Sequence, residues 1–339
     1  MLAGLQARLP DLRVSVRTPL PPDVVSARIA GADPILSGDF DFGVRMSDAM
    51  DVDPHATLSA YARLFQDWPN TLASAMKPLA GSGATLVLSD ISFVSAAAGA
   101  AAGIPVVLMS SLEWAAVFES YCAGLPDAAE LTARMRELYG SARRTIALTP
   151  GLPMRGLPHV SRMGPVAQRG RDRRREVLER LGVAEDVRLV LFAVGGSIPP
   201  APRLTPCPDD VVLLGPPAWS GQDGFRCVDE AGVPFLDLLW SCDLVAAKLG
   251  YGIVAETALA RRPFIGFMRE GWPENAAFAE WIQARVPSEI VGDELAKASP
   301  AWFFACARRL MSAGVTGDHV NDSTAAIVDL LIDELGEAA

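Results

Sequence analysis

Short runs of apolar residues alternate with amphipathic or glycine-rich segments along the whole chain. The short runs are typical of buried strands, and the longer segments between them are typical of helices. The expected strands are Leu12–Arg17, Thr85–Ser89, Pro105–Met109, Thr145–Leu148, Arg188–Val194, Val211–Leu214, Asp243–Ala247 and Pro263–Phe267. The expected helices are Leu2–Leu9, Val94–Ala102, Phe235–Trp240, Ile253–Ala260, Ala301–Met311 and Ser323–Leu335. Strands that alternate with helices predict an α/β protein.

One stretch, Cys242–Asn275, contains a strand, a glycine turn, a helix, a second strand and a polar loop in succession. The turn is Gly250-Tyr251-Gly252. The first N–H groups of a helix have no partner within it, so a glycine turn that opens a helix can bind phosphate. Glu256 lies about one turn into this helix, within reach of such a ligand. The stretch therefore predicts a phosphate site, with an ordinary βαβ unit as the alternative.

The length of 339 residues predicts two domains of ordinary size. The segment Pro150–Pro165 is rich in proline and glycine and is interpreted as the linker between them. We therefore expect an N-terminal domain over residues 1–155 and a C-terminal domain over residues 161–320. A terminal helix is expected over residues 321–339.

Composition and charge exclude several classes of protein. Hydrophobic residues make up 50% and charged residues 21%, as in a globular protein. The net charge of −10 argues against a nucleic-acid partner. The arginine-rich run Arg169–Arg180 also contains acidic residues and is interpreted as a solvated helix start. No apolar run is long enough for stable membrane insertion, and the start of the chain does not resemble a signal peptide.

The cysteines and acidic residues bear on redox compartment and metal binding. The five cysteines are scattered without a CxxC pair, which predicts reduced thiols and a cytoplasmic location. Asp51 and Asp53 could hold a divalent metal or solvate a loop, and His55 close by has no Cys or His neighbour. We expect no metal site.

A longer motif runs through the stretch from Cys242 to Asn275, in the form D-x-V-x-x-K-x-G-Y-G-x-V-x-E followed by R-P-F, R-E and P-E. Its residues are Asp243, Val245, Lys248, Gly250, Tyr251, Gly252, Val254, Glu256, Arg262, Pro263, Phe264, Arg269, Glu270, Pro273 and Glu274. Further motif residues are Leu88–Ser92, Gly103–Pro105, Ser110–Trp114 and Gly195-Gly196-Ser197. The chain resembles GT-B glycosyltransferases, in the family 28 branch that includes the peptidoglycan N-acetylglucosaminyl transferase. It is also similar to the glycosyltransferase-like N-terminal part of plant arabinose kinases.

This resemblance implies the GT-B fold, with two Rossmann-like, doubly wound domains facing a cleft. It also implies that the terminal helix crosses back to the N-terminal domain. Family members open with a strand and a loop containing Gly and His, and neither appears here before the helix Leu2–Leu9. Either the start codon is placed too late or the protein lacks the element, and its loss would uncover a neighbouring central strand.

The resemblance further implies that a nucleoside-diphosphate sugar lies against the C-terminal domain. The pyrophosphate would lie on the glycine turn, and Glu256 would bond the ribose. Lys248 would add a charge or only pack, and Arg269 would offset charge on the leaving diphosphate. Glu274 and Asn275 would read the sugar hydroxyls, where the family has a pair of glutamines. The donor-binding residues expected in this way are Gly195, Gly196, Ser197, Lys248, Gly250, Tyr251, Gly252, Glu256, Arg269, Glu274 and Asn275.

Candidates for the catalytic base lie at the carboxyl ends of two predicted strands. Asp90 follows the first, where it can act as a base or cap the next helix. Glu113 follows the second and is the other candidate base. Trp114 beside it can stack on a sugar or pack in the core.

The activity implied is transfer of a hexosyl group from a nucleotide sugar, UDP-linked, to an unidentified hydroxyl acceptor, with no further cofactor. One alternative is a catalytically inactive, glycosyltransferase-like protein that binds a nucleotide sugar or regulates a partner. Another is a nucleotide-sugar 2-epimerase, which shares the fold and would need a histidine facing the sugar.

Overall fold

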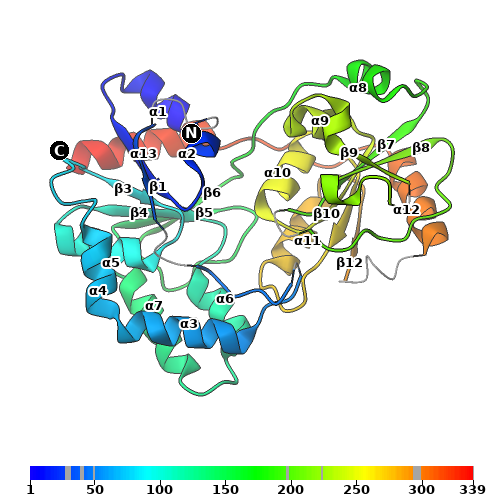
Figure 1. Cartoon of the computed structure of the whole chain (residues 1–339). Helices are drawn as coiled ribbons and strands as arrows, with labels where there is room; N and C mark the ends of the chain where they lie inside the picture. Colours follow the sequence, from blue (N-terminus) through cyan, green and yellow to red (C-terminus); the bar gives the residue numbers. More distant parts are fainter. Residues whose placement is uncertain are drawn as a thin grey trace. The chain divides into compact units, whose positions relative to one another are not determined.

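The computed structural model describes residues 1–26, 32–38, 42–48, 50–195, 198–222, 224–292 and 299–338. The chain forms two compact units. Unit 1 comprises Met1–Arg45, Asp53–Gly164 and Asp322–Ala339, and unit 2 comprises Met46–Val52 and Pro165–Asn321. In Figure 1 unit 1 is blue to green with the red terminal helix, and the main segment of unit 2, Pro165–Asn321, is green to orange.

Unit 1 is an α/β unit with two parallel sheets. One sheet has the strand order β3-β4-β5-β6, and the other is the pair β1-β2. Figure 1 shows α3 to α7 on one side of the larger sheet and α1 and α13 on the other. The elements are α1 (Leu2–Arg8), β1 (Val14–Thr18), α2 (Pro22–Ser26), β2 (Ala32–Ser37), α3 (Pro54–Gln66), α4 (Trp68–Met76), β3 (Val87–Ser89), α5 (Phe93–Ala102), β4 (Val106–Ser110), α6 (Trp114–Cys122), α7 (Ala128–Tyr139), β5 (Arg144–Leu148), β6 (Val160–Met163) and α13 (Thr324–Ala338).

Helix α5 packs closely on the larger sheet because its residues are small. A Cβ on Gly99 would lie 2.2 Å from the Val106 side chain, so only glycine allows this approach to β4. Ser92 caps the start of the helix by accepting a hydrogen bond from the Ser95 amide at 3.2 Å. Gly103 ends it in the left-handed conformation, with φ of 70°. This packing fixes the position of the loop between β3 and α5.

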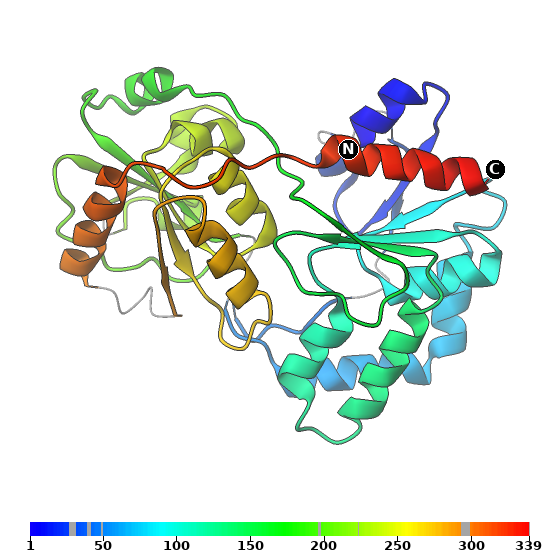
Figure 2. The same cartoon turned by 180° about the vertical axis from the view of Figure 1, so that it is seen from behind.

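The terminal helix α13 belongs to unit 1 and lies beside α1 (Figure 2). Glu334 is only 3% exposed and forms ion pairs with Arg143, at 2.8 Å, and with Arg144. On the exposed side of the helix, Asp329 pairs with Arg8. Unit 1 therefore contains residues from the beginning and from the end of the chain.

Unit 2 contains one parallel sheet with the strand order β12-β11-β10-β7-β8-β9. The chain runs from β7 outward to β9 on one side, and then from β10 outward to β12 on the other. Its elements are α8 (Arg174–Leu181), β7 (Arg188–Ala193), β8 (Val211–Gly215), η1 (Pro217–Trp219), β9 (Phe225–Cys227), η2 (Val228–Ala231), α9 (Phe235–Ser241), β10 (Leu244–Lys248), α10 (Tyr251–Leu259), β11 (Phe264–Phe267), α11 (Asn275–Gln283), β12 (Ser288–Val291) and α12 (Pro300–Ser312).

Both faces of this sheet are buried, which explains its continuous apolar runs. In β10, Val245 and Ala247 pack in one hydrophobic cluster, while Leu244 and Ala246 pack in another on the opposite face. Helices α8 to α11 contribute to the first cluster, and Phe303 of α12 contributes to the second. This alternation follows from the two-residue period of a strand.

One sequence interpretation needs correction, and one motif residue proves to have a structural role. The segment Pro150–Pro165 contains β6, which pairs in parallel with β5, so it is part of the sheet of unit 1 and not a free linker. Asp243 of the longer motif has a structural role at the amino end of β10. Its carboxylate accepts hydrogen bonds from the Leu189 amide at 2.8 Å and from Arg174 at 2.6 Å.

Candidate functional site

The carboxyl edge of the unit 2 sheet holds the main candidate site. The chain reverses its direction of travel across this sheet between β7 and β10, which are hydrogen-bonded neighbours. In open parallel sheets, ligands bind beyond the carboxyl ends of the strands at such a reversal. Gly195 follows β7, Lys248 ends β10, and Gly250 immediately precedes α10. The fold therefore brings these three predicted residues to one place.

Lys248 places positive charge at this reversal. A Cβ on Gly195, whose φ is 80°, would lie 3.7 Å from the Lys248 ammonium. Burial lowers the pKa of Lys248, and the positive charge of Arg269 lowers it further. Two cations that repel each other across a partly buried edge favour an anionic ligand between or beside them.

The start of α10 provides backbone donors at the same edge. Gly250 precedes the helix in an extended conformation, with φ of −153°, and this N-cap glycine has no side chain that could cap the helix. The predicted turn is therefore wrong in part, because Tyr251 and Gly252 already lie in the first turn of α10. The Tyr251 hydroxyl accepts a hydrogen bond from the Val166 amide at 2.8 Å, which ties the start of α10 to the segment before α8.

Open space lies beside the first turn of α10. Gly252 is exposed, and a Cβ there would meet no described atom within 4 Å. Glu256 is half-buried one turn further along the helix, on the same face as Gly252. The predicted residues Gly196 and Ser197 lie outside the described residues.

The loop after β11 is held by contacts among its own side chains. The Arg269 guanidinium lies 3.3 Å from the centre of the Trp272 ring, and the Trp272 indole donates to Glu274 Oε2 at 3.0 Å. The Asn275 amide donates to the Arg269 carbonyl at 2.5 Å. Glu274 is 3% exposed. The two side chains expected to read a sugar therefore take part in organising this loop, and Trp272 is a participant that the sequence reading missed.

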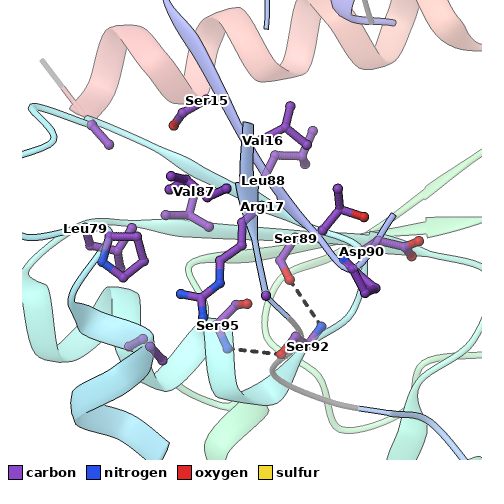
Figure 3. A pocket seen from close by; sticks show the side chains of 18 of the residues that line it. Ser15, Val16, Arg17, Leu79, Val87, Leu88, Ser89, Asp90, Ser92 and Ser95 are labelled. Carbon is purple, nitrogen blue, oxygen red and sulfur yellow. Dashed lines mark hydrogen bonds between the residues drawn. The ribbon is translucent and has the colours of Figure 1, made fainter. Parts of the chain in front are cut away.

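In unit 1, Asp90 lies at the carboxyl end of β3 (Figure 3). Asp90 is exposed to solvent. Nevertheless, the protein atoms around its carboxyl group partly desolvate it, and this raises the pKa of the carboxyl. A hydrogen bond with Ser110, at the end of β4, opposes that rise. Asp90 does not cap α5, because Ser92 occupies that position.

Glu113 follows the neighbouring strand β4 at the same edge of the sheet and lies immediately before α6. It is 3% exposed, and its Oε2 has no hydrogen-bond partner among the described residues. Burial raises the pKa of this carboxyl, although the amides of Ala116 and Ala115 and the charge of Arg136 favour ionisation. A raised pKa makes each of the two carboxylates a stronger base.

Tyr139 connects the loops that carry these two carboxyls, although no local sequence pattern predicts this role. Its hydroxyl is fully buried, donates to the Ile91 carbonyl at 2.7 Å and accepts from the Trp114 amide at 3.2 Å. Ile91 has a φ of 62°, an unusual conformation for a β-branched residue. The hydroxyl therefore fixes the residue after Asp90 and the residue after Glu113.

A cavity of about 600 Å³ lies within unit 1, with Asp90 and Trp114 in its wall. Trp114 is half-buried and packs against the core of the unit, while its ring lies beside Gly43. In the part of the chain that the structure describes, no group of three His, Cys, Asp or Glu residues could hold a metal ion. Across the same described ranges, no helix has both the length and the apolar character needed to cross a membrane.

Comparison with known sequences gives one distant relative. No protein-family model matches the chain. L-arabinokinase of Arabidopsis thaliana is 27% identical over 248 residues, which cover 69% of this chain and 23% of the relative. The chain thus spans about a quarter of the length of that curated relative.

Comparison with solved structures covers nearly the whole chain. The calicheamicin glycosyltransferase CalG4 has a TM-score of 0.64 at 17% identity, with 99% of this chain and 94% of that one covered. UGT89C1 of Arabidopsis thaliana, in complex with UDP, has a TM-score of 0.56 at 13% identity, with 98% and 95% covered. MurG of Acinetobacter baumannii has a TM-score of 0.51 at 15% identity, with 98% and 94% covered. At these identities the likeness shows the fold alone.

Proposed function

We propose that the chain transfers a hexosyl group from a nucleoside-diphosphate sugar to an acceptor hydroxyl. The reason is that the chain has the GT-B fold of glycosyltransferases, as its sequence predicted. The donor is assigned to unit 2 and the acceptor to unit 1. The location proposed is the cytoplasm, in keeping with five free cysteines.

The observation that carries this proposal is the chemistry at the strand reversal of unit 2. Lys248, Gly195 and the uncapped start of α10 meet at one sheet edge, and Arg269 is close enough to lower the pKa of Lys248. Two cations and a helix N-terminus suit a diphosphate, whose four non-bridging oxygens share two negative charges, better than a neutral ligand. Glu256, half-buried one turn along α10, is proposed to bond the ribose hydroxyls.

In the proposed reaction, an acceptor hydroxyl oxygen bonds to the anomeric carbon of the donor. The bond between that carbon and the diphosphate oxygen breaks, and the nucleoside diphosphate leaves with the electron pair. Lys248 and Arg269 would stabilise its developing charge, as preorganised cations do in a partly buried site. The hydroxyl proton passes to a carboxylate of unit 1, for which Asp90 and Glu113 are the candidates.

The nucleotide proposed is uridine diphosphate. UGT89C1, one of the solved neighbours, was crystallised with UDP. Glu274 and Asn275, which also take part in the contacts within the loop after β11, are proposed to contact the sugar.

Calorimetric titration with UDP, UDP-GlcNAc, UDP-glucose and GDP-mannose tests the proposal. Replacing Lys248 by methionine keeps an unbranched side chain and removes the charge. It should weaken the preferred ligand at least about tenfold, since hydrogen bonds to charged groups contribute roughly 1.5–3 kcal/mol. Glu256→Ala should weaken nucleosides and nucleotides alike, because it lies beyond the phosphates.

Lys77→Met is the matched control, because Lys77 is exposed at the end of α4 in unit 1. It should bind as the unchanged chain does. Failure of all four nucleotides to bind, or equal losses in both lysine variants, would overturn the donor site.

A second candidate function is binding of the nucleotide sugar without transfer. It is favoured by the short strand β3, which precedes Asp90 and pairs on one side only among the described residues. An incompletely paired strand holds a catalytic carboxylate less rigidly. The test measures the release of UDP from the donor with and without a mixture of hydroxyl acceptors. Release that exceeds donor hydrolysis when acceptors are present distinguishes transfer from binding alone.

A further inference from the structure

A second cavity of unit 1, of about 690 Å³, lies along helices α3 and α4. Its helical lining residues recur at intervals of three or four positions, so they share one face of the two helices. The Asp67 amide donates to the Arg63 carbonyl, and the Thr71 amide donates to the Asp67 carbonyl, which continues this face from α3 into α4. The helical lining residues are Ala60, Arg63, Leu64, Asp67, Asn70, Thr71 and Ser74, and the other described lining residues are Arg17, Phe42 and Arg45.

Positive charge dominates this cavity. Arg17 reaches it from β1, Arg45 from the loop before α3, and Arg63 from α3. Asp67 is the one carboxylate among the described lining residues, and the Asn70 side-chain amide donates to its Oδ1 at 2.6 Å. The described lining therefore has a formal surplus of two positive charges, although the whole chain has a net charge of −10. We call this cavity the arginine hollow.

Two of these arginines take no part in the ion pairs that stabilise unit 1. The ion pairs among its described residues use Arg8, Arg136, Arg143 and Arg144. Arg45 and Arg63 belong to none of them, and both are exposed. Positive charge that no protein carboxylate neutralises is available to an anionic ligand.

Contacts with its neighbours hold Arg45 in place at the hollow. Its guanidinium lies 4.2 Å from the centre of the Phe42 ring, and that ring lies 4.6 Å from the buried Tyr61 ring. The Arg45 amide donates to the Thr57 hydroxyl at 2.9 Å. The Tyr61 hydroxyl donates to the Gly43 carbonyl at 2.7 Å and so fixes the same loop. Stacking leaves the N–H groups at the rim of the guanidinium directed outward, so they can donate to a ligand.

Arg17 is half-buried and lines both the arginine hollow and the cavity that contains Asp90 (Figure 3). A Cβ on Gly38 would lie 2.6 Å from Arg17 Nε, so glycine at this position leaves room for the guanidinium. Burial lowers the pKa of Arg17, because the charged form loses hydration. An anion beside the guanidinium would offset that cost.

We propose that the arginine hollow binds the phosphate group of a small, soluble phosphate ester. A phosphate monoester carries about two negative charges at neutral pH, which matches the surplus charge of the lining. Guanidinium groups bind phosphate oxygens through pairs of parallel N–H···O hydrogen bonds. This inference is independent of the proposed transferase activity, because the donor is assigned to unit 2.

The size and the remaining lining of the hollow indicate the rest of the ligand. Its volume of about 690 Å³ lies in the range of small-molecule sites, roughly 300–1,000 Å³, and exceeds what a lone phosphate ion would fill. Thr71 and Ser74 offer hydroxyl groups, and Phe42 offers one aromatic ring. A polar body such as a sugar therefore suits the hollow better than a long apolar one.

Calorimetric titration with glucose 6-phosphate, inorganic phosphate and glucose tests this site. The two phosphates should bind and glucose should not, because the phosphate group supplies the charge. Arg45→Met and Arg63→Met should each weaken glucose 6-phosphate at least about tenfold, since charge-assisted hydrogen bonds are roughly twice as strong as neutral ones. Arg63→Lys should lose less, because lysine keeps the charge and lacks only the planar fork.

Arg155→Met is the matched control, because Arg155 is exposed in unit 1 and does not line the hollow. It should bind glucose 6-phosphate as the unchanged chain does. Failure of both phosphates to bind, or equal losses in Arg63→Met and Arg155→Met, would overturn the proposal. Loss of glucose 6-phosphate binding in Lys248→Met would also overturn it, because that result assigns the binding to unit 2.

Two further measurements separate this site from the donor site and from a lipid surface. Arg63→Met should bind UDP as the unchanged chain does, and binding of glucose 6-phosphate without binding of UDP would support the hollow and contradict only the donor site. Vesicles of phosphatidylcholine with phosphatidic acid present the same phosphate group on a membrane. The chain should not sediment with them, and co-sedimentation that Arg63→Met abolishes would overturn a soluble ligand.

Discussion

At the scale of single residues, burial determines what the two carboxyl groups of unit 1 can do. Desolvation raises the pKa of both Asp90 and Glu113, which strengthens each as a base and makes each costlier as an ion. Asp90 is exposed and shares a hydrogen bond with Ser110, so it can reach a substrate. Glu113 is enclosed beside α6. Exposure therefore makes Asp90 the better candidate for the proposed base, because Glu113 is enclosed by protein.

Replacing Glu113 by glutamine should stabilise the protein at neutral pH by about 1 kcal/mol, the usual scale for a buried polar group. The folded-state pKa of Glu113 is raised above its unfolded value, so the unchanged protein loses stability as pH rises through the interval between the two. Below that interval Glu113 is protonated and neutral, as glutamine is, so the variant and the unchanged protein carry the same charge at this position. Denaturant unfolding measured from pH 4 to pH 8 should therefore show the two stability curves diverging as pH increases.

Glu137→Gln is the control, because Glu137 is exposed on α7. Its effect should stay within about 0.5 kcal/mol at every pH, as is usual for surface changes. Parallel curves for the Glu113 variant and the unchanged protein would contradict the prediction.

Residue positions that depend on distant contacts could not be predicted from the sequence. Tyr139 lies 48 positions from Ile91 and 25 from Trp114, so no local pattern links its hydroxyl to either loop. The indole of Trp272 bonds a glutamate only two positions away, but that bond depends on the fold of the loop. Gly250 was predictable as a ligand-binding candidate because a strand, a glycine turn and a helix follow one another directly, whereas Lys248 became a candidate only through the family resemblance.

At the scale of elements, the fully buried strands were predicted well, and strands that were missed, such as β6 and β12, are only partly buried. The runs that became β7, β8, β10 and β11 are apolar throughout, since both faces of their sheet are covered. Strand β12 is half-buried at every position and lacks such a run. Helix α3 was missed although Ala60, Tyr61 and Phe65 share its buried face, because the acidic residues before it suggested a loop.

Replacing Gly252 by alanine should separate the stability of α10 from ligand binding. Alanine in the first turn should stabilise the protein by about 0.5–1 kcal/mol, since glycine is a poor helix former and open space surrounds the site. The methyl group would point toward the helix start, where the diphosphate is proposed to lie. UDP affinity should therefore fall about tenfold, which is ~1.4 kcal/mol, as calorimetry can show.

Gly336→Ala is the matched control, because Gly336 lies in α13 and also has open space around it. It should raise stability in the same way and leave UDP affinity unchanged. Equal affinity in both variants would place the diphosphate elsewhere.

At the scale of the whole molecule, unit 1 depends on a helix that follows all of unit 2 in the sequence. Glu334→Gln should lower the stability of unit 1 by about 2 kcal/mol, because it leaves Arg143 and Arg144 without their buried partner. The loss is smaller than for a fully buried pair, since the two arginine side chains are 30% and 35% exposed. Hydrogen exchange should report faster opening in β5, while UDP binding by unit 2 stays unchanged.

Asp329→Asn on the same helix provides the comparison, since its pair with Arg8 is exposed on both sides. Surface pairs of this kind contribute about 0–1 kcal/mol. A loss as large as that of the Glu334 variant would show that α13 is held by its general charge and not by the buried glutamate.

The split of unit 1 between the two ends of the chain also sets an order of events at the ribosome. Arg144 emerges 190 residues before Glu334, the residue that pairs with it. At about 5–20 residues per second, that interval is roughly 10–40 s. The main segment of unit 2, Pro165–Asn321, is synthesised within this interval, so unit 2 can fold while the first-made part of unit 1 waits for α13. The unit that begins the chain is thus the last to be completed, and a nascent chain stalled shortly before α13 would carry a finished unit 2 beside an unfinished unit 1.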